Sequence, residues 1–408
     1  MKHRIFISMH YLEIGGAETA LVGLLQAIDY SRYDVDLFLH AHRGEMMQFI
    51  PKEVNLLPEI PIYAQIERPM KAVLLDGYIR MVIARMKGKM QTWFYKRHHK
   101  CKESAAGLQY IAEAVTPLLP KINTAVEYDL AISFLQPHNV VRDKVLAKKK
   151  MCWIHTDYTR IDINVEQELP IWRAFDHIVS ISPDVTKTFI SIFPSLSNKI
   201  VEMENILSPE FVKQRAELIP QGEVAKEILK EEGFINFLSI GRFCDAKNYD
   251  NVPEICKRIN SKLSSLNSQL SVKWYIIGYG GYEQLIHQKI KESGMEKNVI
   301  ILGKRSNPYP YIKACDIYVQ PSRYEGKSVT VREAQVLCKP VVVTNYPTAS
   351  SQIQDGVDGK IVPLDNESCA NGIAEFIFDV ERRRQIIEYL KSHNYGNEGE
   401  INKLYNTI

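Results

Sequence analysis

The chain has 408 residues, with 51 Lys or Arg and 48 Asp or Glu, so that its formal net charge is +3. This length predicts two to three domains, and the ordinary composition allows each domain to bury a sizeable core. The small net charge does not by itself indicate a nucleic-acid partner. The seven Cys residues are scattered without a C-x-x-C pair, which disfavours a disulfide framework or a zinc site and favours a reducing compartment.

The first half of the chain alternates strand patterns with helical ones. Residues 5–8 predict a buried strand rather than a signal peptide, and no stretch has the length without charge that a transmembrane helix needs. Gly15 and Gly16 then precede a helical pattern. Such a turn suits a phosphate, but tight strand-to-helix turns use glycine without any ligand as well. The strand predicted at 151–154 ends at His155, where ligands gather in α/β sheets, although a lone His is commonly structural.

Residues 68–102 have a different composition from their surroundings. The segment contains ten Lys or Arg residues but only one acid, Asp76. The cations are interleaved with Leu, Ile, Tyr, Trp and Phe. This pattern is typical of a helix that lies on an anionic membrane surface. It also fits a solvated basic helix whose apolar face packs on its own domain. Nucleic-acid binding is disfavoured, because the patch is local and no recognised binding motif accompanies it.

The second half repeats the strand–helix pattern after a crossing segment. Residues 206–233 contain Pro209, Pro220 and Gly222 and predict a connection between domains. Strands are then predicted at 235–240, 272–277, 299–302, 317–320, 341–344 and 360–363. Repeated βα units of this kind imply a parallel sheet that is covered by helices on both faces.

Polar residues and glycines follow consecutive predicted strands of this second half. Arg242 and Lys247 follow one strand, Gly278 and Gly280 follow the next, and Glu325, Gly326 and Glu333 follow a later one. All of them are expected at the same edge of the parallel sheet. Two cations, glycines and a helix start can hold a diphosphate, while two carboxylates can accept hydrogen bonds from sugar hydroxyls. For Glu333 a second interpretation stays open, because Thr330 and Glu333 have the spacing of a helix capping box.

With these residues the sequence resembles the retaining glycosyltransferases of family 4 over nearly its whole length. The matching pieces are Gly15-Gly16-Ala17-Glu18, His155, Gly241-Arg242 with Lys247-Asn248, Gly278-Tyr279-Gly280, and the pair Glu325 and Glu333. Many members have Gly-Phe-Gly-Leu-Pro after the first glutamate, whereas this chain has Gly326-Lys327-Ser328-Val329-Thr330. The backbone role of the loop survives that change.

The resemblance implies the GT-B fold, in which two Rossmann-like parallel-sheet domains face each other across a cleft. An N-terminal acceptor-binding domain is expected at 1–205 and a nucleotide-sugar-binding domain at 206–380. A C-terminal helix at 381–408 is expected to cross back to the first domain.

The resemblance also implies a role for each matching residue. Arg242 and Lys247 would bind the donor diphosphate, Glu325 would contact the donor sugar, and Glu333 would hold the ribose. Ser328 and Val329 would offer backbone N–H groups to a phosphate, next to Gly326. Gly16 would approach the diphosphate, His155 would contact the sugar near its 6-hydroxyl, and Gly278 and Arg305 would lie beside the nucleotide.

The expected activity is transfer of a sugar from a nucleotide sugar to a glycan or lipid-linked glycan acceptor in surface polysaccharide biosynthesis. Uridine is the expected base on family habit alone, and guanosine and adenosine stay open. No metal and no cofactor is expected, and the expected location is cytoplasmic, peripheral on the inner face of the membrane. Two alternatives remain open at this stage: a nucleotide-sugar epimerase of the same fold, and a non-catalytic nucleotide-sugar-binding module.

Overall fold

The computed structural model of the chain describes residues 2–13, 15–99, 105–158, 161–218, 227–228, 231–266 and 268–408. The chain divides into two compact units, one formed by residues up to 206 together with 397–408, and the other by 207–396. Some residues used in the sequence analysis lie outside the described ranges: Cys101, the cations Lys100 and Lys102 of the basic segment, and Pro220 and Gly222 of the crossing segment.

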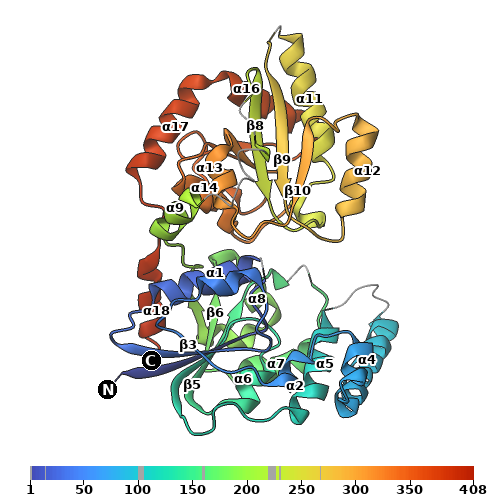
Figure 1. The fold of residues 1–408 in the computed structure, drawn as a ribbon, viewed down its shortest axis with the longest axis vertical. Helices are drawn as coiled ribbons and strands as arrows, with labels where there is room; N and C mark the ends of the chain where they lie inside the picture. The colour runs from blue at the N-terminus through green and yellow to red at the C-terminus, as the bar shows by residue number, and fades with distance from the viewer. Residues whose placement is uncertain are drawn as a thin grey trace. The chain divides into compact units, whose positions relative to one another are not determined.

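The first unit is built on a parallel sheet of seven strands among the described residues, in the order β3-β2-β1-β4-β5-β6-β7. The strands are β1 (His3–Met9), β2 (Tyr33–Leu39), β3 (Asn55–Leu56), β4 (Tyr128–Ser133), β5 (Ala147–Ile154), β6 (His177–Ser180) and β7 (Ile200–Glu202). The helices are α1 (Gly16–Ala27), α2 (Pro61–Ala64), α3 (Met70–Leu75), α4 (Ile79–His99), α5 (Ala106–Val115), α6 (Asn139–Lys144), α7 (Val165–Arg173), α8 (Pro183–Ile192) and α18 (Ile401–Tyr405). Figure 1 shows α4 beside α5 at the outer side of this unit.

The second unit has a parallel sheet of six strands within its described part, in the order β10-β9-β8-β11-β12-β13. The strands are β8 (Phe234–Ile240), β9 (Ser271–Ile277), β10 (Val299–Gly303), β11 (Ile317–Gln320), β12 (Val341–Thr344) and β13 (Lys360–Val362). The helices are α9 (Pro209–Glu217), α11 (Val252–Ser265), α12 (Glu283–Ser293), α13 (Tyr309–Ala314), α14 (Val329–Val336), α15 (Ala349–Gln352), α16 (Asn366–Phe378) and α17 (Val380–Ser392).

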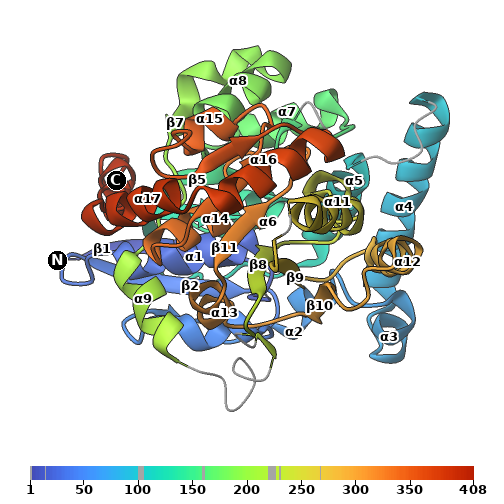
Figure 2. The same ribbon diagram turned by 90° about the horizontal axis from the view of Figure 1, so that it is seen from above.

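Apolar side chains cover both faces of this second sheet, as expected for parallel strands. Along β8, Phe237 joins a buried cluster with α11, α12 and α16, whereas Leu238 joins a second cluster with α9, α13 and α14. Successive side chains alternate between the two faces of a strand, so one apolar run supplies both clusters. The two parallel sheets with flanking helices confirm the predicted fold class. Seen from above, Figure 2 shows α11 and α16 of the second unit side by side.

Residues near the end of the sequence belong to different units. Val380–Ser392 forms α17 within the second unit, and the residues that belong to the first unit begin at Asn397. Leu404 is fully buried there, and the ring of Tyr405 stacks on Tyr33 with 4.5 Å between ring centroids. The backbone N–H of Asp29 donates a hydrogen bond of 2.7 Å to the Tyr405 hydroxyl. The segment that joins the first unit is therefore shorter than the predicted 381–408 and excludes α17.

Among the described residues, no helix has both the length and the apolar character needed to cross a membrane.

Candidate functional site

In the second unit, the strand order changes direction between β8 and β11. Strand β9 lies on one side of β8, and β11 lies on the other side although it comes later in the chain. The loops that leave β8 and β11 therefore start next to each other at the carboxyl edge of the sheet, and ligands of open α/β sheets bind at such switch points. Lys247 follows β8 and Glu325 follows β11.

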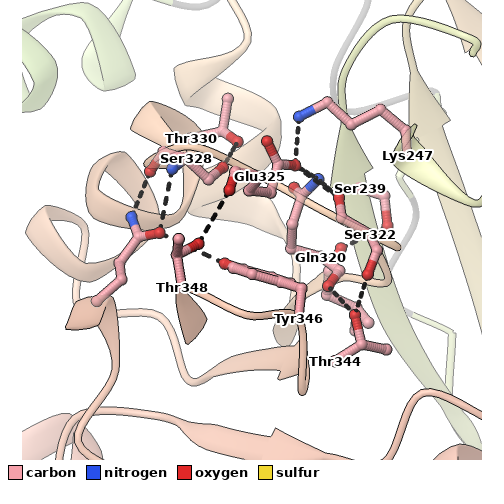
Figure 3. A network of polar contacts seen from close by, with 12 residues as sticks. Ser239, Lys247, Gln320, Ser322, Glu325, Ser328, Thr330, Thr344, Tyr346 and Thr348 are labelled. Atoms are coloured by element: carbon pink, nitrogen blue, oxygen red, sulfur yellow. Dashed lines mark hydrogen bonds and ion pairs between the residues drawn. The ribbon is translucent and has the colours of Figure 1, made fainter. Parts of the chain in front are cut away.

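Lys247 and Glu325 form an ion pair at this edge, with 2.5 Å between Lys247 Nζ and Glu325 Oε1. The side chains are 19% and 11% exposed, so the pair is largely shielded from water without being sealed. The same carboxylate oxygen accepts hydrogen bonds from the Ser322 hydroxyl at 2.6 Å and the Gln320 amide at 3.1 Å. Figure 3 shows this network, in which several donors converge on one carboxylate. Glu325 is therefore held in place by neighbours from its own loop and from the loop after β8.

Arg242 lies five residues before Lys247 in the same loop but has no comparable partner. Its side chain is exposed, and it makes no hydrogen bond or ion pair with any residue that the structure describes. A guanidinium with this freedom can bind an anion without first losing an internal partner. The loop after β8 therefore offers one paired and one unpaired cation.

Helix α14 begins directly after the Glu325 loop, with Ser328 as its N-cap residue. The Ser328 side chain makes no capping bond, but its backbone N–H donates to the Gln352 side-chain oxygen at 3.1 Å. The hydroxyl of Thr348 donates to the backbone oxygen of Glu325 at 3.0 Å, so that α15 and its preceding residue hold the loop in place. Gly326 is half-buried within this loop, and Val329 is the first helical residue.

The capping-box interpretation of Thr330 and Glu333 is wrong, because the helix begins after Ser328. Thr330 lies inside the helix, and its hydroxyl accepts a hydrogen bond of 2.7 Å from Tyr318. Glu333 is 3% exposed and accepts a hydrogen bond of 2.9 Å from the Tyr309 hydroxyl. Burial raises the pKa of Glu333 to about 7, and the hydrogen bond from Tyr309 opposes that rise.

Gly278 and Arg305, two further predicted residues, have partners within the second unit. A Cβ atom on Gly278 would lie 2.0 Å from the backbone oxygen of Gly241, so the close approach of two strand ends requires glycine there. The guanidinium of Arg305 pairs with Glu227 at 2.6 Å and donates to the Tyr311 hydroxyl at 2.9 Å. Sequence reasoning did not identify either of these structural roles.

In the first unit, Gly16 is the first residue of α1, and a Cβ atom added to it would meet nothing within 4 Å. His155 follows β5, and its Nε2 lies 2.8 Å from the backbone oxygen of Phe134. Because a carbonyl oxygen only accepts, Nε2 carries the proton and Nδ1 is left as an acceptor. Burial lowers the pKa of His155 to about 4, while the bond to Phe134 opposes that shift. A neutral imidazole of this kind can accept a hydrogen bond from a sugar hydroxyl.

The sequence analysis missed the residues that hold Glu325 and the helix start, namely Gln320, Ser322, Thr348 and Gln352. Single polar residues at strand ends and in loops carry no recognisable spacing, so no sequence signal marked them. It also missed a contact at the carboxyl edge of the first sheet, where His10 Nδ1 lies 2.6 Å from Glu67 Oε1.

Comparisons with known proteins agree with this architecture. Residues 221–393 match the family model described as Glycosyl transferases group 1. A Campylobacter jejuni N-acetylgalactosamine-N,N'-diacetylbacillosaminyl-diphospho-undecaprenol 4-alpha-N-acetylgalactosaminyltransferase is 28% identical over 161 residues, which are 39% of this chain and 41% of that protein. An Escherichia coli UDP-Gal:alpha-D-GlcNAc-diphosphoundecaprenol alpha-1,3-galactosyltransferase is 27% identical over 168 residues, covering 40% of this chain and 42% of that protein. These matches span less than half of each relative.

Solved structures match over the whole chain. HepE from Anabaena in complex with UDP has a TM-score of 0.63 at 16% identity, covering 100% of this chain and 98% of that one. A mutant of Staphylococcus aureus TarM in complex with fondaparinux, alpha-GlcNAc-glycerol and UDP has a TM-score of 0.65 at 13% identity, covering 100% and 99%. At such identities the likeness shows the fold alone. The chain has the GT-B fold, and its match to the glycosyl transferases group 1 family covers less than half of the chain, at residues 221–393.

Proposed function

We propose that this protein is a retaining, metal-independent glycosyltransferase that moves a hexosyl group from a nucleotide sugar, with uridine as the base, to a glycan or lipid-linked glycan acceptor in surface polysaccharide biosynthesis. The observation that carries the proposal is the Lys247–Glu325 pair next to the unpaired Arg242, at the switch point between β8 and β11. In support, the E. coli relative is named as a galactosyltransferase that uses UDP-Gal and a diphosphoundecaprenol acceptor.

The proposed donor site uses the charges of the second unit. Arg242 and Lys247 bind the diphosphate. The N–H groups of Ser328 and Val329 donate to a phosphate beside Gly326, and the Ser328 N–H gives up its bond to the Gln352 side chain to do so. Glu325 accepts hydrogen bonds from the donor sugar, and Glu333 accepts them from the ribose. In the present structure Lys247 binds Glu325, so a diphosphate at this place competes with the carboxylate for the ammonium group. Gly278 and Arg305 lie beside the nucleotide. As the resemblance implies, Gly16 of the first unit approaches the diphosphate and His155 contacts the sugar near its 6-hydroxyl.

In the proposed reaction the bond between the anomeric carbon and the diphosphate oxygen breaks first, through an oxocarbenium-like transition state. The acceptor hydroxyl attacks from the face that the diphosphate leaves, so that the configuration at the anomeric carbon is retained. The departing phosphate oxygen takes the proton of the acceptor hydroxyl. Fixed cations aimed at the leaving group stabilise the charge that develops on it, which is the task that a metal ion performs in other transferases.

The proposed partners follow from this activity. They are the nucleotide sugar, the glycan or lipid-linked acceptor, and an anionic membrane surface reached through residues 68–102. A lipid-linked acceptor lies in a membrane, so the proposed location is cytoplasmic and peripheral at the inner membrane face.

Isothermal calorimetry with UDP, GDP and ADP, in the presence of a chelator, tests the donor site. We expect one nucleotide to bind the wild type and Arg242→Gln to weaken it by about 30-fold or more, since a truncated charge contact costs about 2 kcal/mol or more. Lys297→Gln is the matched control, because Lys297 is exposed and lies outside the site. Lys247→Ala should also lose binding, and Glu325 keeps Ser322 and Gln320 as donors in that variant. Equal affinities of wild type and Arg242→Gln would refute the assignment.

Product analysis separates the alternatives. Release of the nucleotide only in the presence of an acceptor supports a transferase. An epimerase would change the sugar of the bound donor without an acceptor, and a binding module would leave the donor intact.

A further inference from the structure

Helix α4 has two faces with different surroundings. Met81, Arg85 and Gly88 are buried on its inner face. A Cβ atom on Gly88 would lie 2.7 Å from the Cα of Ile111, so α4 and α5 cross in direct backbone contact. The packing expected for a solvated basic helix is therefore present, but it uses this face alone.

The outer face of α4 carries large apolar side chains exposed to solvent. Their exposed fractions are 58% for Ile79, 62% for Ile83, 58% for Met86, 56% for Met90, 53% for Trp93 and 58% for Phe94. The spacing of three or four residues places them in one stripe, because an α-helix turns by about 100° per residue. By the same geometry the stripe lies opposite the inner face. We call these six residues the outer stripe.

Cations flank the outer stripe on both sides. The helical angle places Arg80 and Lys87 along one border, and Lys89 and Lys96 along the other. The sequence of α4 from Ile79 to His99 contains no acid. Arg80, Lys87 and Lys89 make no ion pair with the residues that the structure describes. The outer face therefore combines apolar side chains at its centre with positive charge along its edges.

Contacts on the inner face hold α4 in this orientation. Arg85 donates hydrogen bonds to the backbone oxygens of Gln65 and Arg68, at 3.1 Å and 2.6 Å. The Tyr95 hydroxyl donates to the backbone oxygen of Ile163 at 2.8 Å. These contacts fix both halves of the helix to the first unit. The outer stripe consequently cannot turn inward without breaking them.

We propose that the outer stripe of α4 inserts into an anionic lipid surface, with the helix axis in the plane of that surface. An interfacial helix buries its apolar face at the level of the lipid headgroups while Lys and Arg at its borders contact the phosphates. This inference deepens the membrane partner of the proposed function by naming the face that makes contact, and it does not depend on the donor site. Pairing of two copies through their stripes is disfavoured, because it would bring the flanking cations of both copies together.

Trp93 provides a built-in reporter of insertion. It is 53% exposed, whereas Trp153, Trp172 and Trp274 are at most 2% exposed. The sequence contains four Trp residues, so a change of solvent around the tryptophans on vesicle binding arises at Trp93. Insertion moves its ring from water into the interface and shifts its emission to shorter wavelength.

The experiment uses the full chain with vesicles of equal parts phosphatidylglycerol and phosphatidylcholine, and with phosphatidylcholine alone. We expect flotation with the anionic vesicles and a blue shift of Trp93 emission that is absent in Trp93→Phe. Ile83→Gln with Met90→Gln should lower the partition coefficient by at least about tenfold, through loss of buried apolar surface. Lys87→Gln with Lys89→Gln should lower it by about 25-fold on anionic vesicles, at about fivefold per cation.

Matched controls keep the test specific. Lys52→Gln with Lys121→Gln removes the same charge from exposed positions elsewhere on the first unit. Leu146→Gln removes an apolar side chain that is 55% exposed outside α4. Both controls should bind vesicles like the wild type, and UDP binding should be unchanged in every variant.

Several results would overturn the proposal: no flotation of the wild type at low salt, flotation without a Trp93 shift, or stripe variants that bind like the controls. Light scattering that shows a dimer lost in the stripe variants, without vesicle binding, would assign the stripe to a second copy. Failure of nucleotide binding with intact flotation would refute the donor site and leave this inference standing.

Discussion

The carboxyl edges of the two sheets share one topology but present different chemistry. In the first sheet, where the order changes between β1 and β4, the edge carries imidazoles: His10, His40, His138 and His155 follow β1, β2, β4 and β5. In the second sheet, where the order changes between β8 and β11, the edge carries Lys247 and Glu325. Burial lowers the pKa of His138 to about 3 and that of His155 to about 4, which leaves both neutral. His138 and His155 at the first edge are thus neutral hydrogen-bonding groups, whereas the second edge carries the fixed charges of Lys247 and Glu325.

This difference suggests a division of labour on a shared backbone plan. Neutral imidazoles suit hydroxyl groups, whereas an ammonium and a guanidinium suit a diphosphate. Strand order determines where the loops meet, and the residues after each strand determine what they bind. The three predictions below probe this difference between the edges.

The largest expected effect concerns the glycines of the two edges. Gly278→Ala places a Cβ atom 2.0 Å from the Gly241 backbone oxygen, so we expect a loss of about 3 kcal/mol or more in unfolding free energy. Gly16→Ala meets nothing within 4 Å and should leave stability unchanged or slightly raised, while weakening the donor complex. Urea unfolding and nucleotide calorimetry measure the two effects. Equal stability losses would show that both glycines serve packing.

Glu333 should make the second unit sensitive to rising pH. Its pKa in the folded protein is about 7, above the ordinary 4.5, so the folded state binds the proton more tightly than the unfolded state. The resulting stabilisation is complete below pH 4.5 and is lost as the pH rises through 7. Glu333→Gln should remove this dependence, worth about 3 kcal/mol across the window. Denaturant titrations of variant and wild type at several pH values between 4.5 and 7 measure it. The same pH dependence of unfolding free energy in both proteins would contradict the assignment.

His155 should give the first unit the opposite dependence, with a smaller amplitude because its side chain is only partly buried. Its pKa of about 4 lies below the ordinary 6.5, so the unfolded state binds the proton more tightly. Stability is therefore lost as the pH falls from 6.5 through 4, by about 2 kcal/mol. His155→Gln should be less sensitive to acid than the wild type in the same titrations, and a variant of unchanged acid sensitivity would show that His155 is not buried as a neutral base.

Much of the fold followed from the sequence, because apolar runs and helical periodicity repeat with every βα unit. The parallel sheets and the order of loops at the second edge were predicted in this way. The partners of Glu325 were not, since Gln320, Ser322, Thr348 and Lys247 meet only after the sheet forms. Thr330 and Glu333 matched a capping box by spacing, but the N-cap is Ser328, and tertiary contacts with Tyr318 and Tyr309 engage both side chains.

For the basic segment, sequence composition posed a choice that the fold answers in part. Sequence alone does not say which face of α4 packs on the protein. Gly88 marks the inner face, because it permits the close crossing with α5. The assignment of Arg305 to the nucleotide base stays a prediction. The ion pair of Arg305 with Glu227 was not visible in the sequence.

The stacking of Tyr405 on Tyr33 has a consequence for how the chain acquires its structure. The first unit is assembled from two stretches of chain separated by residues 207–396. During synthesis the sheet of the first unit emerges first, yet its contacts with Leu404 and Tyr405 form only after the second unit has been translated. The entropy of closing that long loop grows only logarithmically with its length. Prior folding of the second unit shortens the effective loop further, so the two units are expected to fold in an interleaved order.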